Sequence, residues 1–326
     1  MATKNITTMN RVIICILSFT MLFSCQKNNK IEEVNFFPST IKFMATGGVE
    51  DILISATSTW EIKDCPDWIH ISKQNGIEGI SNVRITAQPN PSKINRNATL
   101  SVFCNGVNDI LKITQEGASL DFNVEDKVMN FDFLEHYIEI KPKTNIPYEI
   151  THCEDWMIIT DLRDLSYIFD HDYSVTIQPN PTDSPRSGVI IIGGTESSIF
   201  DTLYVNQSEF QQFIKIQKFS MGKNSVGGCS ASIEYSNVSD KTFKYVYFSV
   251  YFQNNVGDAV KCTITGDTYK RLQYVGPIEP GKNGSGYWSN LIYNYSATKI
   301  LLASCSIEFM DGTKTTYSSS LVDRLF

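Results

Sequence analysis

Apolar and polar residues alternate along most of this chain. In residues 82–87, which read N-V-R-I-T-A, every second side chain is apolar, as in a strand that buries one face. Similar short runs, rich in Val, Ile, Phe, Tyr and Thr, are interrupted by Gly, Pro, Asn and Asp about every ten residues. This spacing is typical of all-β sandwiches, and no sustained helical period follows the first 24 residues. The pattern predicts an all-β fold.

One phrase occurs twice at an offset of 88 residues, as CPDWIHIS at 65–72 and CEDWMIIT at 153–160. A Gln-Pro-Asn-Pro tetrapeptide follows each phrase, and the offset drifts slightly along the copies. Small drifts of this kind are typical of loop insertions between matched strands. We predict that residues 34–117 and 118–208 are two copies of one immunoglobulin-like sandwich.

Each copy is predicted to hold seven strands in two packed sheets. Trp60, Trp68 and Trp156 fall on strand phases that point inward, so we expect them to fill the cores. In the first copy the strands are expected at roughly 41–45, 50–57, 59–63, 67–72, 82–87, 98–103 and 110–115.

The repeat is lost from about Phe210 onward. The run 241–252 is apolar or aromatic on both faces, which predicts a strand in the middle of a sheet that is covered on both sides. Residues 209–326 are therefore predicted to form a third sandwich. The expected fold is all-β, with three tandem immunoglobulin-like β-sandwich domains after a lipoprotein signal peptide.

The first residues have the layout of a secretory signal. Lys4 and Arg11 precede an uncharged apolar run of about a dozen residues, which is shorter than the roughly 20 that a membrane-spanning helix needs. The run ends in Leu-Phe-Ser-Cys, which resembles a bacterial lipobox and implies cleavage after residue 24 and lipidation of Cys25. Residues 25–33 then form a flexible tether.

Charge and cysteine content narrow the function. The net charge of −7, without a basic patch, argues against a nucleic-acid partner. Six cysteines follow Cys25 in the expected mature chain, and Cys104 of the first copy aligns with Gly194 of the second, so a shared disulfide is not expected. The cysteines of the third sandwich lie on the apolar phase of strands, which favours buried free thiols over bridges.

No catalytic, metal or cofactor motif is found in the sequence. The four histidines are scattered, and no nucleophile elbow, phosphate loop or dinucleotide fingerprint is present. Asp161, Asp164, Asp170 and Asp172 crowd one loop, where a solvated acidic loop is favoured over a calcium site because the alternating spacing and distal Glu are missing. We predict no catalytic residue, no metal and no cofactor.

The first copy resembles a BACON domain, a module found mainly in Bacteroidetes near the start of secreted or lipid-anchored proteins. The residues that carry the resemblance are Gly47-Gly48, Trp60, the run Trp68-Ile-His-Ile-Ser72, Gly76, Gly79, Asn90, Arg96 and the closing Ile113-Thr-Gln-Glu-Gly117. The second copy departs from this pattern, with Tyr148 in place of Trp and no Gly-Gly pair. The resemblance implies a carbohydrate-binding module, and a spacer role is equally compatible.

The third segment resembles a small β-sandwich domain of unknown function found in bacterial surface and membrane proteins. The resemblance spans most of 213–317 and implies no activity. It is carried by Tyr245 to Asp258, Gly276-Pro-Ile-Glu-Pro-Gly281, Trp288-Ser-Asn290, Tyr293-Asn294 and Phe309-Met-Asp-Gly-Thr313.

Glycan binding needs exposed aromatic faces beside polar groups, and the connection 266–288 offers both. Its Gly- and Pro-rich sequence gathers the candidate ligand residues Tyr269, Arg271, Tyr274, Tyr287 and Trp288, with Lys270 between the first two. Trp288 also matches the family pattern, so a core role is the alternative for it.

These features together predict a non-catalytic, lipid-anchored protein of the cell envelope, at the outer membrane, with its periplasmic and surface faces both open. It is expected to act as a binding or presentation module, with polysaccharide or glycoprotein glycan as partner. The alternative is an adhesin or structural surface subunit that meets protein through an exposed strand edge. An unrecognised glycan hydrolase comes third, because glycosidases need a carboxylate pair that no spacing here selects.

Overall fold

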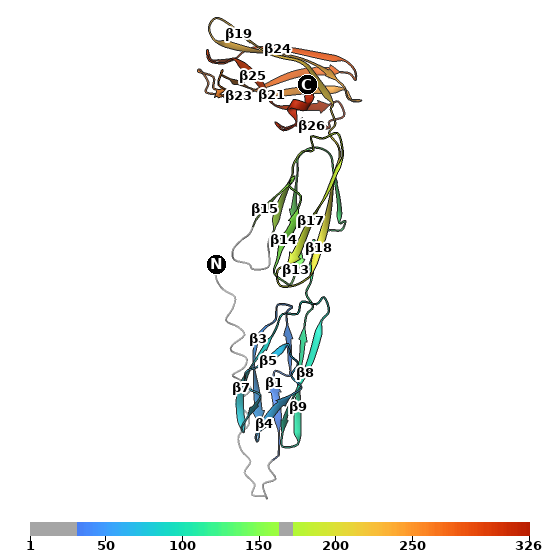
Figure 1. Cartoon of the computed structure of the whole chain (residues 1–326), viewed down its shortest axis with the longest axis vertical. Coiled ribbons are helices and arrows are strands. Elements are labelled where there is room, and N and C mark those ends of the chain that lie inside the picture. Colours follow the sequence, from blue (N-terminus) through green and yellow to red (C-terminus); the bar gives the residue numbers. More distant parts are fainter. Residues whose placement is uncertain (1–30, 163–171) are drawn as a thin grey trace. The chain divides into compact units, whose positions relative to one another are not determined.

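The computed structural model describes residues 31–162 and 172–326, and their regular structure is β-strand apart from one short 3₁₀ helix. The prediction of an all-β fold of immunoglobulin-like sandwiches is confirmed. The chain divides into two compact units, one with the first sandwich and one with the second and third (Figure 1). No helix in these described ranges is long and apolar enough to cross a bilayer. Cys25, the predicted signal peptide and most of the acidic loop lie outside them.

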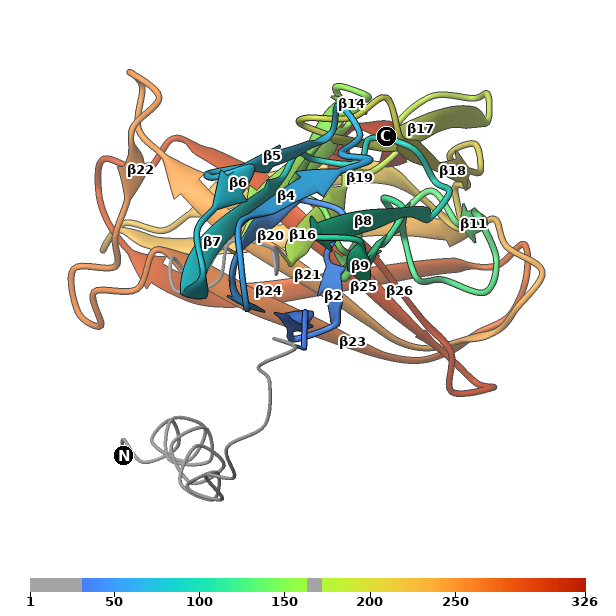
Figure 2. The same ribbon diagram turned by 90° about the horizontal axis from the view of Figure 1, so that it is seen from below.

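The first sandwich consists of β1 (Val34–Phe37), β2 (Thr40–Phe43), β3 (Gly48–Ala56), β4 (Trp60–Lys63), β5 (Ile69–Ile71), β6 (Asn75–Gly76), β7 (Gly79–Ala87), β8 (Arg96–Cys104) and β9 (Val107–Gln115). Its sheets have the orders β1-β3-β7-β5 and β2-β9-β8-β4-β6, and β4 and β8 of the second sheet can be followed in Figure 2. The seven predicted strands are all present in outline. The short strands β1 (four residues) and β6 (two residues) were not predicted.

The second sandwich consists of β10 (Leu120–Asp121), β11 (Val128–Phe131), β12 (His136–Ile140), β13 (Lys143–Thr144), β14 (Tyr148–Cys153), β15 (Met157–Asp161), β16 (Tyr173–Ile177), β17 (Arg186–Gly194) and β18 (Phe200–Gln207). Its main sheets, β11-β18-β17-β14 and β12-β16-β15, repeat the pairings of the first sandwich. In both, an early strand pairs in parallel with the last one, as β2 does with β9 and β11 with β18. Tyr148 lies opposite Gly194 as Trp60 lies opposite Cys104, which is the alignment expected from the repeat.

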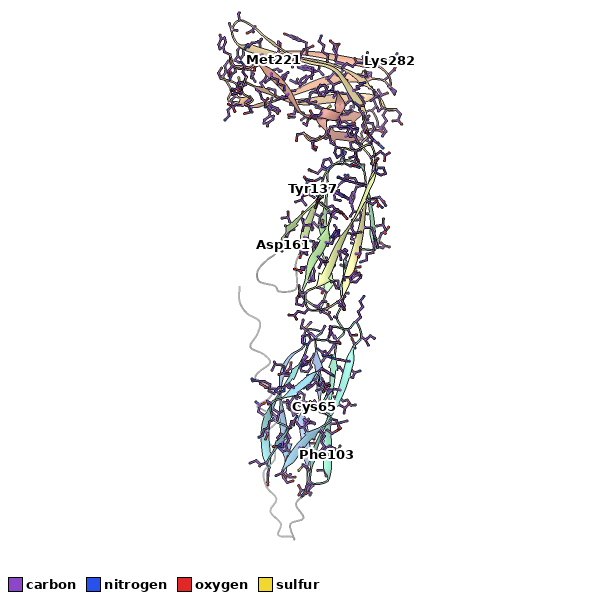
Figure 3. The ribbon with its side chains drawn as sticks, viewed as in Figure 1. Cys65, Phe103, Tyr137, Asp161, Met221 and Lys282 are labelled. Atoms are coloured by element: carbon purple, nitrogen blue, oxygen red, sulfur yellow. The ribbon has the colours of Figure 1, made fainter. Side chains whose placement is uncertain are left out.

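The third sandwich consists of β19 (Ile214–Lys223), β20 (Gly228–Asn237), β21 (Phe243–Gln253), β22 (Ala259–Val260), β23 (Tyr269–Ile278), β24 (Asn283–Tyr293), β25 (Lys299–Phe309), β26 (Lys314–Tyr317) and the 3₁₀ helix η2 (Val322–Leu325). One sheet has the order β19-β20-β24, and the other has β22-β21-β25-β26 with β23 also paired to β21. Figure 1 shows these two sheets as separate layers, and the labelled Met221 and Lys282 lie towards opposite ends of the domain in Figure 3.

Trp60 and Gly76 account for part of the BACON-like pattern. The Trp60 side chain is 2% exposed, and β6 pairs with β4 so that Gly76 lies opposite it. A Cβ atom on Gly76 would lie 2.4 Å from the indole ring, so only glycine allows this close approach. Gly47 is needed for two reasons, because its φ is +78° and a Cβ would lie 2.2 Å from the carbonyl oxygen of Ala87.

Trp68 is only partly buried, and the side chain of Arg96 stacks on its indole ring, an arrangement that we call the arginine clasp. The indole is half-buried just before β5, and the guanidinium carbon of Arg96 lies 4.3 Å from the ring centroid. Arg96 Nε donates to Gln115 Oε1 at 2.8 Å, and Nη2 donates to the Gln88 carbonyl at 2.8 Å. The planar cation therefore covers the ring and ties it to the backbone.

The second copy has the same clasp. Arg186 lies 4.2 Å from the Trp156 ring and donates to Gln207 Oε1 at 2.9 Å and to the Gln178 carbonyl. Trp156, like Trp68, is half-buried and precedes its strand, here β15. The expectation that both tryptophans are core plugs is therefore wrong in detail, because an arginine forms one side of each site.

The repeated cysteine is part of a turn. Cys65 Sγ donates to the Ile69 carbonyl at 3.2 Å, and Cys153 Sγ donates to the Met157 carbonyl at 3.4 Å (Cys65 is labelled in Figure 3). Burial raises the pKa of both thiols, that of Cys153 to about 11, so they stay protonated and able to donate. Cys-x-Asp-Trp is a local fold signature.

All six cysteines within the described ranges are free, as the apolar phase of Cys229, Cys262 and Cys305 suggested.

A buried asparagine closes one loop of each sandwich. Asn90, Asn180 and Asn237 are at most 3% exposed, and each donates from Nδ2 to the carbonyl four residues later at 2.8–3.0 Å. Each also donates to a second carbonyl at 2.8–2.9 Å and accepts the backbone N–H two residues on. Since a buried amide needs these partners, the asparagine fixes the loop. The third sandwich shares this feature although its sequence repeat is lost.

The second and third sandwiches share an aromatic cluster. Phe133, which lies between β11 and β12, is 2% exposed and packs 5.4 Å from Phe210 and 5.9 Å from Tyr317. Arg324 donates to the Pro181 carbonyl at 2.6 Å, pairs with Asp183 and lies 4.6 Å from the Phe210 ring. The C-terminal segment thus packs onto the second sandwich.

We expect Trp60→Ala to destabilise the first sandwich by about 3–5 kcal/mol, as for full burial of an aromatic ring, and Trp68→Ala by only about 1–3 kcal/mol. Hydrogen exchange of the β7 amides in the soluble fragment 31–326 reports the opening free energy of this sandwich alone. Equal losses from the two variants would restore the interpretation of Trp68 as a core plug.

Candidate functional site

The five predicted ligand residues do not form one surface. The segment 266–288 is not an irregular connection, because it holds β23 and the start of β24, which belong to different sheets. Tyr269 and Arg271 point outward from β23, whereas Tyr287, 69% exposed, points outward from β24 on the other sheet. The sandwich therefore separates them.

Tyr274 and Trp288 pack towards the core. The Tyr274 ring lies edge-to-face on Tyr235 at 5.8 Å, and the Trp288 ring lies 6.4 Å from Phe248. Both are partly buried against the core of the third sandwich. The alternative core role for Trp288 fits this position, and neither ring offers a free face to a ligand.

Tyr269 and Arg271 belong to a larger aromatic surface, which we call the tyrosine face. It is the outward side of the sheet around β21, and its rings are Tyr245, Tyr247, Tyr251 and Tyr269. Alternation places them there, because the intervening residues of β21 point into the core, where Val246, Phe248, Val250 and Phe252 are 0% exposed. The three tyrosines of β21 are half-buried and Tyr269 is 58% exposed.

The four rings form two pairs, and the two rings within each pair lie close together. Tyr245 and Tyr247 have centroids 6.1 Å apart, and Tyr251 and Tyr269 lie 5.5 Å apart across β21 and β23. The guanidinium carbon of Arg271 lies 4.1 Å from the Tyr247 centroid. This cation–π contact orients both side chains on the face.

A hollow of about 190 Å³ opens on the tyrosine face beside Tyr247. Its polar lining comes from three strands beside β21: Arg271 of β23, Ser306 and Glu308 of β25, and Lys314 and Thr316 of β26. The hydroxyls of Ser306 and Thr316 lie 2.9 Å apart across the sheet. Aromatic rings, hydroxyls and charged groups are thus combined within one shallow site.

Glu308 is the carboxylate that lines this hollow, and two lysines pair with it. Lys244 Nζ and Lys314 Nζ each lie 3.1 Å from one of its carboxylate oxygens. Hydrogen bonds from the two lysines hold the pKa of Glu308 below its usual range, so the carboxylate is ionised at neutral pH. Of the two lysines, Lys314 also lines the hollow.

A larger hollow of about 370 Å³ lies in the second sandwich between β14 and β15. His152, Cys153 and the labelled Asp161 of Figure 3 are among its lining residues. Asp161 and Tyr173, which also lines it, flank residues 163–171 in sequence, outside the described ranges. Because this hollow borders residues outside the described ranges, we assign no site to it.

The described residues contain no group of three side chains that could hold a metal ion. Of the acidic loop, Asp164 and Asp170 lie outside the described ranges, and Asp172 lies 3.5 Å from Lys141 Nζ. The catalytic and cofactor predictions stay as predictions.

Tyr245, Tyr247 and Tyr251 were not among the predicted ligand residues. The strand β21 was expected to be covered on both sides, whereas its tyrosine side keeps solvent-accessible surface. The signal was the alternation itself, since the run Y-V-Y-F-S-V-Y-F at 245–252 places tyrosines on one face and Val or Phe on the other.

Comparison with known proteins identifies the first sandwich. Residues 33–118 match the family model described as a viral BACON domain. A search of curated proteins gave no match.

Solved structures give weak overall likenesses. A Bacteroides ovatus GH5 xyloglucanase, in complex with a XXXG heptasaccharide, is 26% identical over 31% of this chain, with a TM-score of 0.25; the match covers 21% of that enzyme. A titin tandem is 10% identical over 88% of this chain and 98% of its own, with a TM-score of 0.39. An endo-fucoidan hydrolase of glycoside hydrolase family 107 is 10% identical over 84% of this chain and 41% of its own, with a TM-score of 0.24.

The family match thus falls on the sandwich in which Trp60, Gly76 and Arg96 carry the sequence resemblance and have the structural roles described above. Residues 33–118 are therefore a BACON-like domain, and the family match does not extend beyond this first sandwich.

Proposed function

We propose that this protein is a non-catalytic, lipid-anchored protein of the bacterial cell envelope that binds carbohydrate through the tyrosine face of its third sandwich. The observation that carries the proposal is the outward row of tyrosines beside a hollow lined by hydroxyls and charged groups. Sugar rings pack their C–H faces on aromatic rings, and their hydroxyls need polar partners at the edge. The tyrosine face supplies both.

An open sheet face suits a long polymer better than a small molecule. The hollow, at about 190 Å³, is smaller than the roughly 300–1,000 Å³ typical of enclosed ligand pockets. A polysaccharide lying across β21 and β23 would use several rings in succession, with one substituent in the hollow.

The first sandwich fits a spacer role. Its Trp60 is buried beneath β6, and the outer side of Trp68 is covered by Arg96, so neither indole presents an open ring. Ligand binding is therefore assigned to the third domain, and the BACON domain lies between it and the proposed anchor in sequence.

Tyr251→Ala and Tyr269→Ala are each expected to weaken polysaccharide binding by about fivefold, because loss of one aromatic contact is worth about 1 kcal/mol. Affinity electrophoresis of the fragment 31–326 against a broad panel of plant and mucin polysaccharides measures this. Tyr287→Ala is the matched control, since it removes an exposed tyrosine from the opposite sheet. Equal effects of all three variants, or no binding by the parent fragment, would contradict the assignment.

The same incubations test the hydrolase alternative. Reducing ends released from any polymer of the panel would show catalysis, which the proposal does not expect.

Cys25→Ala is expected to abolish incorporation of labelled fatty acid, because this thiol is the acyl acceptor of the proposed lipobox. Metabolic labelling in a bacterial host, followed by gel fluorography, measures the modification. Cys15→Ala is the control, since that cysteine lies within the leader proposed to be cleaved off. Label retained without Cys25 would exclude the lipid anchor.

A protein partner is the second candidate. β24, with eleven residues, is an edge strand of its sheet in the described part of the chain, and such an edge can pair with another strand. Concentration-dependent assembly of the fragment in sedimentation experiments would favour this role.

A further inference from the structure

We propose that the tyrosine face selects acidic polysaccharides, with a carboxylate or sulfate group of the sugar chain held beside Arg271 and Lys314. This inference rests on the proposed carbohydrate-binding function and adds the chemical class of the ligand. Three features support it: the unpaired state of Arg271, the excess of positive charge around Glu308, and the size of the hollow.

Arg271 differs from every other arginine that the structure describes. Arg84 pairs with Asp51, Arg324 pairs with Asp183, and Arg96 and Arg186 donate to glutamine side chains and backbone carbonyls. Within the described ranges the guanidinium of Arg271 has no hydrogen-bond acceptor and no carboxylate partner. It stacks on the ring of Tyr247.

Stacking leaves the donors of Arg271 available. A guanidinium that lies flat on a ring keeps its N–H groups in its own plane, directed sideways from the stack. Arg271 is exposed and lines the hollow. A planar fork of this kind matches the paired oxygens of a carboxylate or the oxygens of a sulfate.

The charge around the hollow is positive in a protein whose net charge is negative. Lys244 and Lys314 both pair with Glu308, and Arg271 lines the same hollow, so three cations accompany one carboxylate and an excess of positive charge remains. The nearby acids at the ends of the face are already paired, Asp267 with Lys270 and Asp311 with Lys241. The whole chain carries −7, so this positive area is a local feature.

The hollow accommodates a substituent rather than a whole chain. Its volume of about 190 Å³ and the hydroxyls of Ser306 and Thr316 suit one charged group with its neighbouring sugar hydroxyls. The sugar rings themselves would pack on Tyr251 and Tyr269, outside the hollow.

The test compares polymers that differ only in charge. Affinity electrophoresis of the fragment 31–326 uses polygalacturonate against its carboxyl-reduced form, and dextran sulfate against dextran. We expect each acidic polymer to bind at least about tenfold more tightly than its neutral partner, since a charge-assisted hydrogen bond contributes about 1.5–3 kcal/mol. A preference within only one pair identifies the anion as carboxylate or as sulfate.

Variants that each remove one charge test whether the preference for acidic polymer arises at the hollow. Arg271→Gln is expected to remove most of the preference for acidic polymer, and Glu308→Gln to increase it several-fold by releasing Lys244 and Lys314. Lys218→Gln, on the other sheet, is the matched control for loss of one positive charge, and it should change little. Arg271 and Lys218 are exposed, so the melting temperatures of their variants should match that of the parent fragment.

Each outcome decides between the two proposals. Equal binding of acidic and neutral polymers overturns the charge preference and leaves the carbohydrate-binding function in place. Equal effects of Arg271→Gln and Lys218→Gln overturn the location. Failure to bind any polymer overturns both, and only this last result removes the proposed function itself.

Discussion

The direction in which β21 turns its apolar residues decides what the third sandwich presents to solvent. This central strand pairs with β23 on one side and β25 on the other, so its side chains have only two directions available. Four of them are fully buried, namely Val246, Phe248, Val250 and Phe252. Since a one-residue shift of register would exchange the two faces, burial of this row also fixes the tyrosines outside.

The tyrosine face depends on cross-strand register as much as on β21. Tyr251 lies opposite Tyr269, and Tyr247 lies opposite Ser306, which in turn pairs with Thr316. Residues that are far apart in sequence are therefore neighbours on one surface. Arg271 lies opposite Ser249 in the ladder, yet its guanidinium extends diagonally to the Tyr247 ring.

Much of this fold could be predicted from the sequence, because alternation and repetition are local signals. The duplicated module, the phase of the buried cysteines and the inward position of Trp60 all follow from them. What covers a strand on its second face is not a local property. The same aromatic run at 241–252 is compatible with a doubly covered strand and with a solvent-facing tyrosine row, and only the arrangement of the neighbouring strands distinguishes them.

The candidate ligand residues were harder to predict for a related reason. Tyr287 and Trp288 lie close to Tyr269 and Arg271 in sequence, but the turn between β23 and β24 carries the chain from one sheet to the other. Tyr274 stays on β23, where alternation turns it towards the core. Proximity along the chain therefore corresponds to separation across the sandwich. The clasp of Arg96 on Trp68 escaped prediction in the same way, since Trp68 precedes β5 of one sheet, Arg96 begins β8 of the other, and the two side chains meet only after the sheets pack.

The three sandwiches use their aromatic residues differently, and this difference supports a division of roles. In the first two domains, a buried ring lies in the core and an arginine covers the second ring, so aromatic surface contributes to stability. In the third domain the core contains its own aromatics, and the four rings of the tyrosine face lie outside it. In all three sandwiches a buried asparagine closes a loop by donating to the carbonyl four residues later. The net charge of −7 opposes the approach of an acidic polymer to the protein as a whole, so the local positive charge beside the tyrosine face would favour binding there.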